Sequence, residues 1–175
     1  MPRLFQPYAA KCLGVYKCPG DRLQGTTGPR IRSVSMNCFI GDYVGLNEDS
    51  WLGGSLYRKF KKMSEFTRPG PSSTFVFLDE CPDSINDGLI HIYPDGGANG
   101  GTTEAAWDDV PTPVHNSGGG LSFADGHSEV HKWKDANTIF PPSKYVGSAG
   151  ASCRGYGLVS PKDHNWLAYR TTALK

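Results

Sequence analysis

The sequence has no long hydrophobic run and little net charge. Apolar stretches such as Thr74 to Leu78 fall far short of the roughly 20 residues that cross a bilayer, and Met1 to Phe5 lacks the apolar segment of a secretory signal. We therefore expect no membrane insertion of this chain. The 18 Lys and Arg residues nearly balance the 17 Asp and Glu residues, giving a formal charge of +1. No nucleic-acid partner is expected, because proteins that bind nucleic acids usually show a strong basic excess on one face.

Two motifs of common metal and catalytic sites are also missing. No Cys-x-x-Cys pair occurs, which argues against a zinc ribbon or a thioredoxin-type site. No Gly-x-Ser-x-Gly elbow occurs, which argues against a serine hydrolase. The chain has five cysteines, an odd number, so at least one thiol stays unpaired within a monomer. Cys12 and Cys18 are close enough to bridge across a turn, and free thiols are the alternative.

Glycine and proline, in contrast, are abundant. The 22 glycines and 13 prolines in 175 residues exceed the usual combined share of roughly 12% and exclude a coiled coil, a helical bundle and a helical solenoid. A hydrophobic share of 38% and an aromatic share of 11% are enough for one core, so the chain is not expected to be disordered. We expect a single α+β domain that is mostly β, with long Gly/Pro-rich loops and few short helices.

Alternation of apolar and polar residues predicts the strands. Residues 32–40 alternate, and the apolar side of this half-buried strand holds Val34, Met36, Cys38 and Ile40. Thr74 to Leu78 is the clearest strand, and Leu89 to Tyr93 follows it after an acidic loop. These strands predict a small antiparallel sheet.

A hairpin and one short helix complete the predicted elements. Leu121 to Ala124 and Ser128 to Trp133 read as the two arms of a hairpin that turns at Asp125 and Gly126. Weak helical spacing between residues 50 and 66 allows a short helix there. The predicted division is an irregular opening segment at 1–30, a sheet core at 31–134 with a long loop at 95–117, and an extended tail at 135–175.

Three blocks of sequence carry a resemblance to a known family. They are His115 to Gly126 with its continuation to Trp133, Phe77 to Glu80 with residues 83–88, and Tyr16 to Asp21 with Arg32 to Asn37. Together, over about residues 16 to 134, they resemble the prepilin-type proteins named for a histidine, nine residues and Asp-Gly. That family is similar to the major pseudopilins of type II secretion systems and so to type IV pilin-like filaments.

The resemblance implies a pseudopilin-like globular head. In the family, such a head follows an N-terminal apolar helix that forms the filament core and packs on the sheet, and this chain is expected to lack that helix. The partners implied are other pilin-like subunits, and the location implied is the periplasm or cell envelope. The missing export signal leaves the cytoplasm as the alternative location for the chain as written.

An acidic loop is the candidate metal site. Calcium prefers six to eight oxygen ligands on a flexible loop, and pseudopilin heads commonly hold calcium beside the sheet, so the resemblance implies the same ion. An Asx-turn with exposed carboxylates is the alternative interpretation. The predicted calcium ligands are Asp79, Glu80, Ser84, Asn86 and Asp87 with Asp125, and Asp83 lies among them. A second oxygen set comprises Asp95, Asn99, Glu104, Asp108 and Asp109.

A histidine-rich hairpin supports a competing hypothesis. His127, Asp125 and Glu129 share one face of an extended strand, and His115 reaches them if the glycine run folds back. Such groups bind calcium or zinc or activate water, which predicts a metal-dependent hydrolase of small esters or lactones with His115, Asp125 and His127 as catalytic residues. A purely structural turn is the alternative for this motif. A third interpretation, a carbohydrate-binding module, rests on the four tryptophans.

The favoured hypothesis is therefore a calcium-stabilised, non-catalytic pseudopilin-like headpiece. Calcium would tie down loops that a small core cannot hold.

Overall fold

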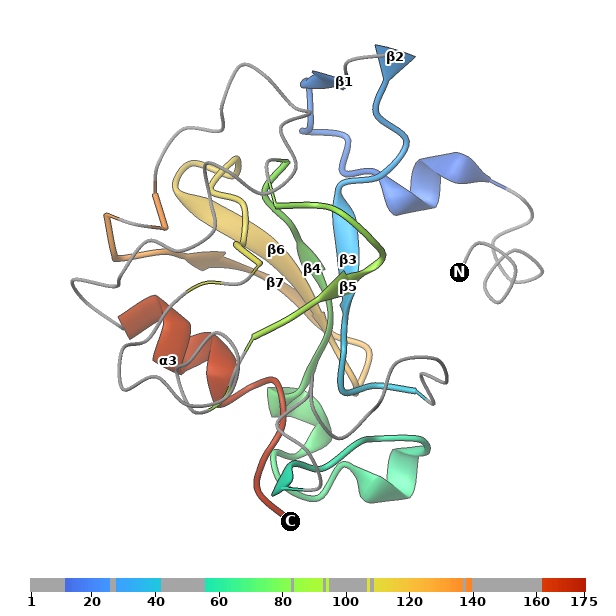
Figure 1. Ribbon diagram of the computed structural model, residues 1–175, viewed down its shortest axis with the longest axis vertical. Helices are drawn as coiled ribbons and strands as arrows, with labels where there is room; N and C mark the ends of the chain where they lie inside the picture. The colour runs from blue at the N-terminus through green and yellow to red at the C-terminus, as the bar shows by residue number, and fades with distance from the viewer. Residues whose placement is uncertain are drawn as a thin grey trace.

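The computed structural model describes residues 12–25, 28–41, 56–82, 84–92, 94, 107, 109–136, 138–139 and 162–175. A five-stranded sheet with the order β5-β3-β4-β6-β7 is the centre of the fold (Figure 1). Its strands are β3 (Val34–Asn37), β4 (Phe75–Asp79), β5 (Leu89–Ile90), β6 (Gly118–Phe123) and β7 (Ser128–Lys132). A two-stranded ribbon, β1 (Gln24–Gly25) and β2 (Gly28–Pro29), and the short 3-10 helices η1 (Leu13–Tyr16), η3 (Met63–Glu65) and η4 (Pro71–Ser73) lie outside it.

The sheet is mixed, which corrects the prediction of an antiparallel sheet. β5 pairs with β3 in parallel, with Met36 opposite Leu89, whereas the other pairs in this sheet are antiparallel. The segment after β4 does not reverse into a hairpin, because the amides of Ser84 and Ile85 both bond the Cys81 carbonyl and turn the chain aside. β5 therefore pairs with the edge of β3 that faces away from β4. The α+β, mostly β class is confirmed.

The β6–β7 hairpin confirms the sequence prediction. Leu121 pairs with Glu129 and Ser122 with Ser128, on either side of the predicted turn. The strand β6 begins earlier than predicted, because the glycines at 118–120 are part of it. A Cβ on Gly119 would lie 2.9 Å from the Thr112 carbonyl, so the glycine lets another segment pack directly against the strand.

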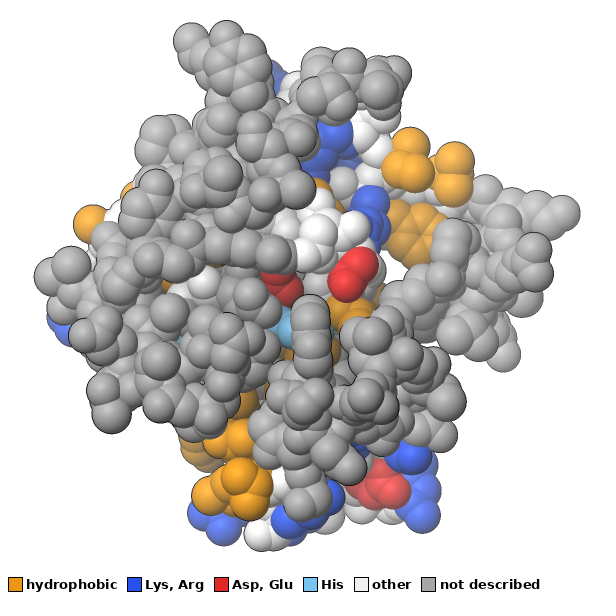
Figure 2. Space-filling model, viewed as in Figure 1, with side chains coloured by type: hydrophobic (Ala, Val, Ile, Leu, Met, Phe, Trp, Pro, Cys, Tyr) orange, Lys and Arg blue, Asp and Glu red, His pale blue; other side chains and the backbone are white. Residues whose placement is uncertain are grey.

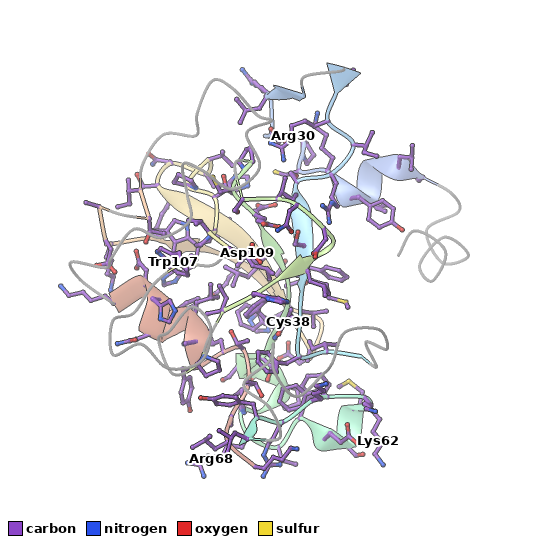
Figure 3. The ribbon with its side chains drawn as sticks, viewed as in Figure 1. Arg30, Cys38, Lys62, Arg68, Trp107 and Asp109 are labelled. Atoms are coloured by element: carbon purple, nitrogen blue, oxygen red, sulfur yellow. The ribbon has the colours of Figure 1, made fainter. Side chains whose placement is uncertain are left out.

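The main core lies on one face of the sheet and is covered by α3 (Lys162–Ala168). Leu78, Leu121 and Phe123 pack with Leu167 of the helix, and the buried Trp107 meets the His164 ring edge-on at 5.1 Å. Figure 3 shows Trp107 beside α3. The helix corrects the prediction of an extended tail at 135–175. Its burial against the sheet, rather than a strong local pattern, stabilises it.

Both faces of β3 are covered to some degree, so the predicted polar face is not exposed. On the predicted apolar side, Met36 packs against a second core cluster that contains the buried Cys38. The polar Ser35 and Asn37 are the buried residues, whereas Val34 and Met36 are half-buried. Asn37 is fully buried because its amide group donates to the Phe75 carbonyl at 3.0 Å and to the Thr171 carbonyl at 2.9 Å. Its hydrogen bonds offset the desolvation of the side chain. The polar face of β3 therefore joins the sheet to the C-terminal segment.

In the range 50–66, where a short helix was predicted, the described residues 56–66 contain no α-helix. Phe60 is buried and stacks on Phe66 with ring centroids 4.5 Å apart. Leu56 and Met63, the other residues at helical spacing, are exposed. Within residues 56–66, Leu56 and the three residues of η3 have 3-10 geometry. Across all the described residues, no helix is long and apolar enough to span a membrane.

Candidate functional site

Three side chains with metal-binding or catalytic chemistry meet at one point. His115 Nε2 lies 3.3 Å from Cys18 Sγ and 2.9 Å from Asp79 Oδ2. The three ligand atoms all lie within 4.8 Å of one another. Within the described part of the chain, no other group of three His, Cys, Asp or Glu side chains converges in this way. Each residue comes from a different one of the three blocks that carry the prepilin-type resemblance.

Cys18 is held by a tight turn and by the start of β3. The Asp21 amide bonds the Cys18 carbonyl at 3.0 Å, closing a turn that has Pro19 and Gly20 at its centre, where their backbone preferences favour a reversal. The Cys18 amide donates to Ser33 Oγ at 2.7 Å. Asp21 also forms a buried ion pair with Arg30, at 3.6 Å, which fixes the same segment. Arg30 is labelled in Figure 3.

Asp79 is the last residue of β4 and lies beside β6. Its Oδ2 accepts a hydrogen bond from the Gly120 amide at 3.1 Å as well as contacting His115. Burial raises the pKa of Asp79, and the Gly120 amide and the His115 ring partly offset that rise. A Cβ on residue 120 would lie 2.8 Å from Oδ2. Glycine at this position therefore makes the approach of the carboxylate possible.

His115 is presented by a turn with two consecutive left-handed residues. Asn116 has φ 53° and Ser117 has φ 62°, conformations that are uncommon for residues other than glycine. Lys132 Nζ donates to the carbonyls of His115 and Asn116 at 2.6 and 2.7 Å. The lysine thereby binds the exposed carbonyls of the turn. The His115 side chain keeps 29% of its surface exposed.

The geometry at His115 resembles a metal site more than a nucleophile–base–acid triad. In such a triad the nucleophile and the acid contact different ring nitrogens, because one nitrogen accepts a proton while the other is held by the acid. Here Cys18 and Asp79 both contact Nε2. One ring nitrogen has a single in-plane lone pair or proton, so it makes one well-aligned hydrogen bond. A cation placed among the three atoms would satisfy all of them.

A surface groove of about 730 Å³ adjoins this cluster. Cys18 and Asp79 both line it. Its remaining walls come from η1, from the turn after it and from strands β3, β4, β6 and β7. The apolar lining residues that are exposed or half-buried are Val15, Pro19, Val34, Phe77 and Val130, and Lys17 and Glu129 add a charge of each sign.

The predicted calcium ligands are divided among several roles. Glu80 is buried and accepts hydrogen bonds from Ser35 and, at 3.0 Å, from Ser84. Burial raises the pKa of Glu80 well above its ordinary value, and the nearby Asp109 carboxylate raises it further. Asp79 belongs to the Cys18 cluster instead. The Glu80 carboxylate and the Ser84 hydroxyl are thus already used within the core.

The other predicted ligands lie elsewhere. Asp87 caps the Leu89 amide at 2.7 Å, and Asn86 is exposed. Asp125 is at the β6–β7 turn, bound to His127. The calcium site therefore remains a prediction from the sequence. In the second oxygen set, Asp109 accepts a hydrogen bond from a backbone amide, that of His91, at 2.7 Å. Its companions Asp95, Asn99, Glu104 and Asp108, and also Asp83, lie outside the described residues.

The predicted catalytic residues are split between two places. Asp125 Oδ1 lies 2.6 Å from His127 Nδ1 at one end of β6, whereas His115 precedes the other end. Six extended residues separate the ends by about 20 Å. The glycine run does not fold back, because residues 118–120 pair with β7. The hairpin site of His115, Asp125 and His127 is therefore not assembled.

The structure also bears on the possible Cys12–Cys18 disulfide and on the tryptophans considered for sugar binding. Cys12 and Cys18 form no disulfide. Trp107 and Trp133 are buried, and Trp166 is stacked on His131 and covered by the Arg170 guanidinium at 3.9 Å, while Trp51 lies outside the described residues. These tryptophans serve the core or a local stack, which removes the basis for a sugar-binding surface in the described residues.

Cys18 is the site residue that the sequence left unassigned. The signal that could have found it is the turn sequence Cys18-Pro19-Gly20-Asp21, which holds a thiol at a rigid reversal. Comparisons of the chain with protein-family models, with curated proteins and with solved structures gave no match. The function must therefore be argued from the cluster, the groove and the sheet.

Proposed function

We propose that the chain is a non-catalytic, pseudopilin-like headpiece whose open sheet face binds an apolar helix of a pilin-like subunit. The observation that carries the proposal is the asymmetry of the sheet. One face holds the main core and α3, while the other presents the groove. Figure 1 shows α3 to the left of the strands and η1 to the right.

Strand alternation explains why the two faces differ. Leu78 is fully buried in the core, whereas its neighbour Phe77 lines the groove. On β7, the side chain of Val130 lines the groove and the residue remains 53% exposed. Burial of such side chains against a helix would be worth about 25 cal/mol for each Å² of apolar surface removed from water.

Exposed apolar residues of η1 extend the same surface. Leu13 and Val15 are 58% and 57% exposed, and Figure 2 shows apolar side chains at the upper right over η1. The prepilin-type resemblance supplies the occupant, because its members pack an apolar helix on the sheet. Charge of both signs at the groove, from Lys17, Asp79 and Glu129, favours no strongly charged ligand.

A synthetic helix of about 20 Leu and Ala residues with terminal lysines would test this function. Amide hydrogen exchange should show slower exchange in β3, β4, β6 and β7 when the helix is present. Val130→Lys should abolish the effect, because the ammonium would be buried under the helix. Tyr169→Lys is the matched control, since Tyr169 is 67% exposed at the end of α3. Protection that is absent, or that survives Val130→Lys, would refute the proposal.

A second candidate function is hydrolysis of a small ester or lactone in the groove. Its volume of about 730 Å³ lies in the range of small-molecule sites, roughly 300–1,000 Å³. The reactive groups would be Cys18, Asp79 and His115 in place of the separated hairpin residues. A panel of small esters and lactones tests this function. Turnover that Cys18→Ala removes and Cys12→Ala preserves supports it, and no turnover refutes it.

A further inference from the structure

We infer that Cys18, Asp79 and His115 form a binding site for a divalent transition-metal ion, with Zn²⁺ as the ion that fits best. The inference goes beyond the proposed helix-binding function and does not depend on it. It rests on the convergence of three donor atoms from three distant parts of the chain.

The donor set matches the chemistry of zinc. Thiolate sulfur, imidazole nitrogen and carboxylate oxygen are its three usual protein ligands, at about 2.3, 2.0–2.1 and 2.0–2.2 Å. A tetrahedral ion with those bond lengths holds its sulfur and nitrogen ligands roughly 3.6 Å apart and its nitrogen and oxygen ligands roughly 3.4 Å apart. The observed separations are 3.3 Å for Cys18 and His115 and 2.9 Å for His115 and Asp79. Cys18 Sγ and Asp79 Oδ2 lie within 4.8 Å of each other, whereas a tetrahedral ion would hold them roughly 3.6 Å apart. The donors would therefore move by up to about 1 Å to take the ion.

The surroundings hold the donors in place. Asp79 is tied by the Gly120 amide, Cys18 by the Ser33 hydroxyl and the carbonyl of His115 by Lys132. The Gly120 bond is made to the carboxylate itself, and hydrogen bonds of that kind orient metal ligands in protein sites. The other two bonds fix the backbone of Cys18 and His115. Calcium is disfavoured at this point, because it requires six or more oxygen ligands and the cluster provides one carboxylate.

The number of protein ligands indicates an open fourth position. Three protein ligands with one open position are typical of zinc sites that bind water or an outside ligand. Cys18 and Asp79 both line the groove, so the fourth position would face it. The ion would also join the segment that carries η1 to β4 and to the start of β6. That cross-link restrains the unfolded chain, because Cys18 and His115 are 97 residues apart and Asp79 and His115 are 36 apart.

Binding is tested with the metal alone. Purified chain freed of metal with a chelator is titrated with Zn²⁺ under calorimetry, and with Co²⁺ under absorption spectroscopy. We expect one equivalent of each ion, a sulfur-to-cobalt charge-transfer band in the near ultraviolet, and a melting temperature that rises with free Zn²⁺. No binding, or a cobalt spectrum without the sulfur band, would overturn the inference.

Matched variants locate the site. Cys18→Ser, Asp79→Asn and His115→Gln should each weaken Zn²⁺ by more than about a hundredfold, since loss of an outer hydrogen-bond partner alone costs 10–100-fold. Cys12→Ser and His127→Gln are the controls and should bind as the wild type does. Circular dichroism of the metal-free proteins shows whether each variant folds. Equal weakening by the controls would overturn the assignment.

Alkylation of the unmodified protein gives a second readout that does not depend on variants. Trypsin cuts after Lys11, Lys17 and Arg22, so Cys12 and Cys18 fall on separate peptides. Zn²⁺ should slow alkylation of Cys18 and leave the exposed Cys12 unaffected. Equal rates at Cys18 with and without Zn²⁺ would refute the site. None of these measurements involves a helix or a substrate, so failure here is distinct from failure of the proposed function.

Discussion

Substitution of Gly120 by alanine tests how the sheet positions the carboxylate of the cluster. A Cβ at this position would lie 2.8 Å from Asp79 Oδ2, closer than Cβ contacts in folded proteins. The carboxylate must then move away by about half an ångström, with loss of contact energy. That motion weakens its hydrogen bond from the Gly120 amide and its contact with His115, which are 3.1 and 2.9 Å long.

The expected loss of stability is about 2 kcal/mol. Overpacking a fitted site costs roughly 1–3 kcal/mol, and a hydrogen bond to a charged group contributes about 1.5–3 kcal/mol. The flexible Asp79 side chain absorbs part of the strain, so we expect the middle of the first range. For a chain of 175 residues, such a change lowers Tm by roughly 4–8 °C. Thermal and urea denaturation measure it.

Alanine substitutions at two other glycines should have a smaller and a larger effect on stability than Gly120→Ala. At Gly70 a Cβ would meet nothing within 4 Å and φ is −72°, so Gly70→Ala should leave stability unchanged or raise it by up to about 1 kcal/mol. At Gly118 a Cβ would lie 2.5 Å from the His131 carbonyl, which is backbone and cannot rotate away. Gly118→Ala should therefore be the most destabilising. Gly120→Ala as stable as Gly70→Ala would refute the described placement of Asp79.

Three further predictions concern buried polar and titratable groups. Burial and the nearby Asp109 raise the folded-state pKa of Glu80, so the wild type loses stability as pH rises above the ordinary value of about 4.5. Glu80→Gln cannot ionise and should therefore gain stability relative to the wild type over that range. Urea denaturation measured against pH checks this. Asn37→Ala should cost about 3–5 kcal/mol in urea denaturation, since it removes three buried hydrogen bonds and leaves their backbone partners unsatisfied. In His127→Asn, the pKa of Asp125, lowered chiefly by its hydrogen bond from His127, should return toward its usual value, as a nuclear magnetic resonance titration would show; an unchanged pKa would contradict this.

Local patterns predicted the elements whose partners are close in sequence. The β6–β7 hairpin follows from two apolar arms around Asp125-Gly126, and β4 follows from the apolar run before Pro82. In both cases the signal and the structure occupy the same dozen residues. Elements stabilised by distant contacts were predicted less well. The helix α3 is one, because the Lys134 amide bonds the Asp163 carboxylate at 2.8 Å and secures its first turn from 28 or more residues away.

The candidate site likewise combines residues that local patterns indicate with a meeting of side chains that depends on distant contacts. Asp79 and His115 were selected from the sequence by residue type, but they were assigned to two different sites. Nothing in a linear spacing of 36 or 97 residues indicates that their side chains meet each other and Cys18. Their meeting depends on β4 and β6 being neighbours and on the turn after η1 passing beside them.

By itself, the sequence determined the class of the fold, the absence of a long apolar span and the positions of the main strand and the hairpin, because composition and period-two alternation act over short distances. The tertiary structure alone decided that the sheet is mixed, that polar Asn37 is buried while Phe77 lines a groove, and that a thiol, a carboxylate and an imidazole converge. These outcomes depend on which strands become neighbours and on which face α3 covers. Such choices are made by burial and hydrogen bonding summed over the whole domain rather than within any one segment.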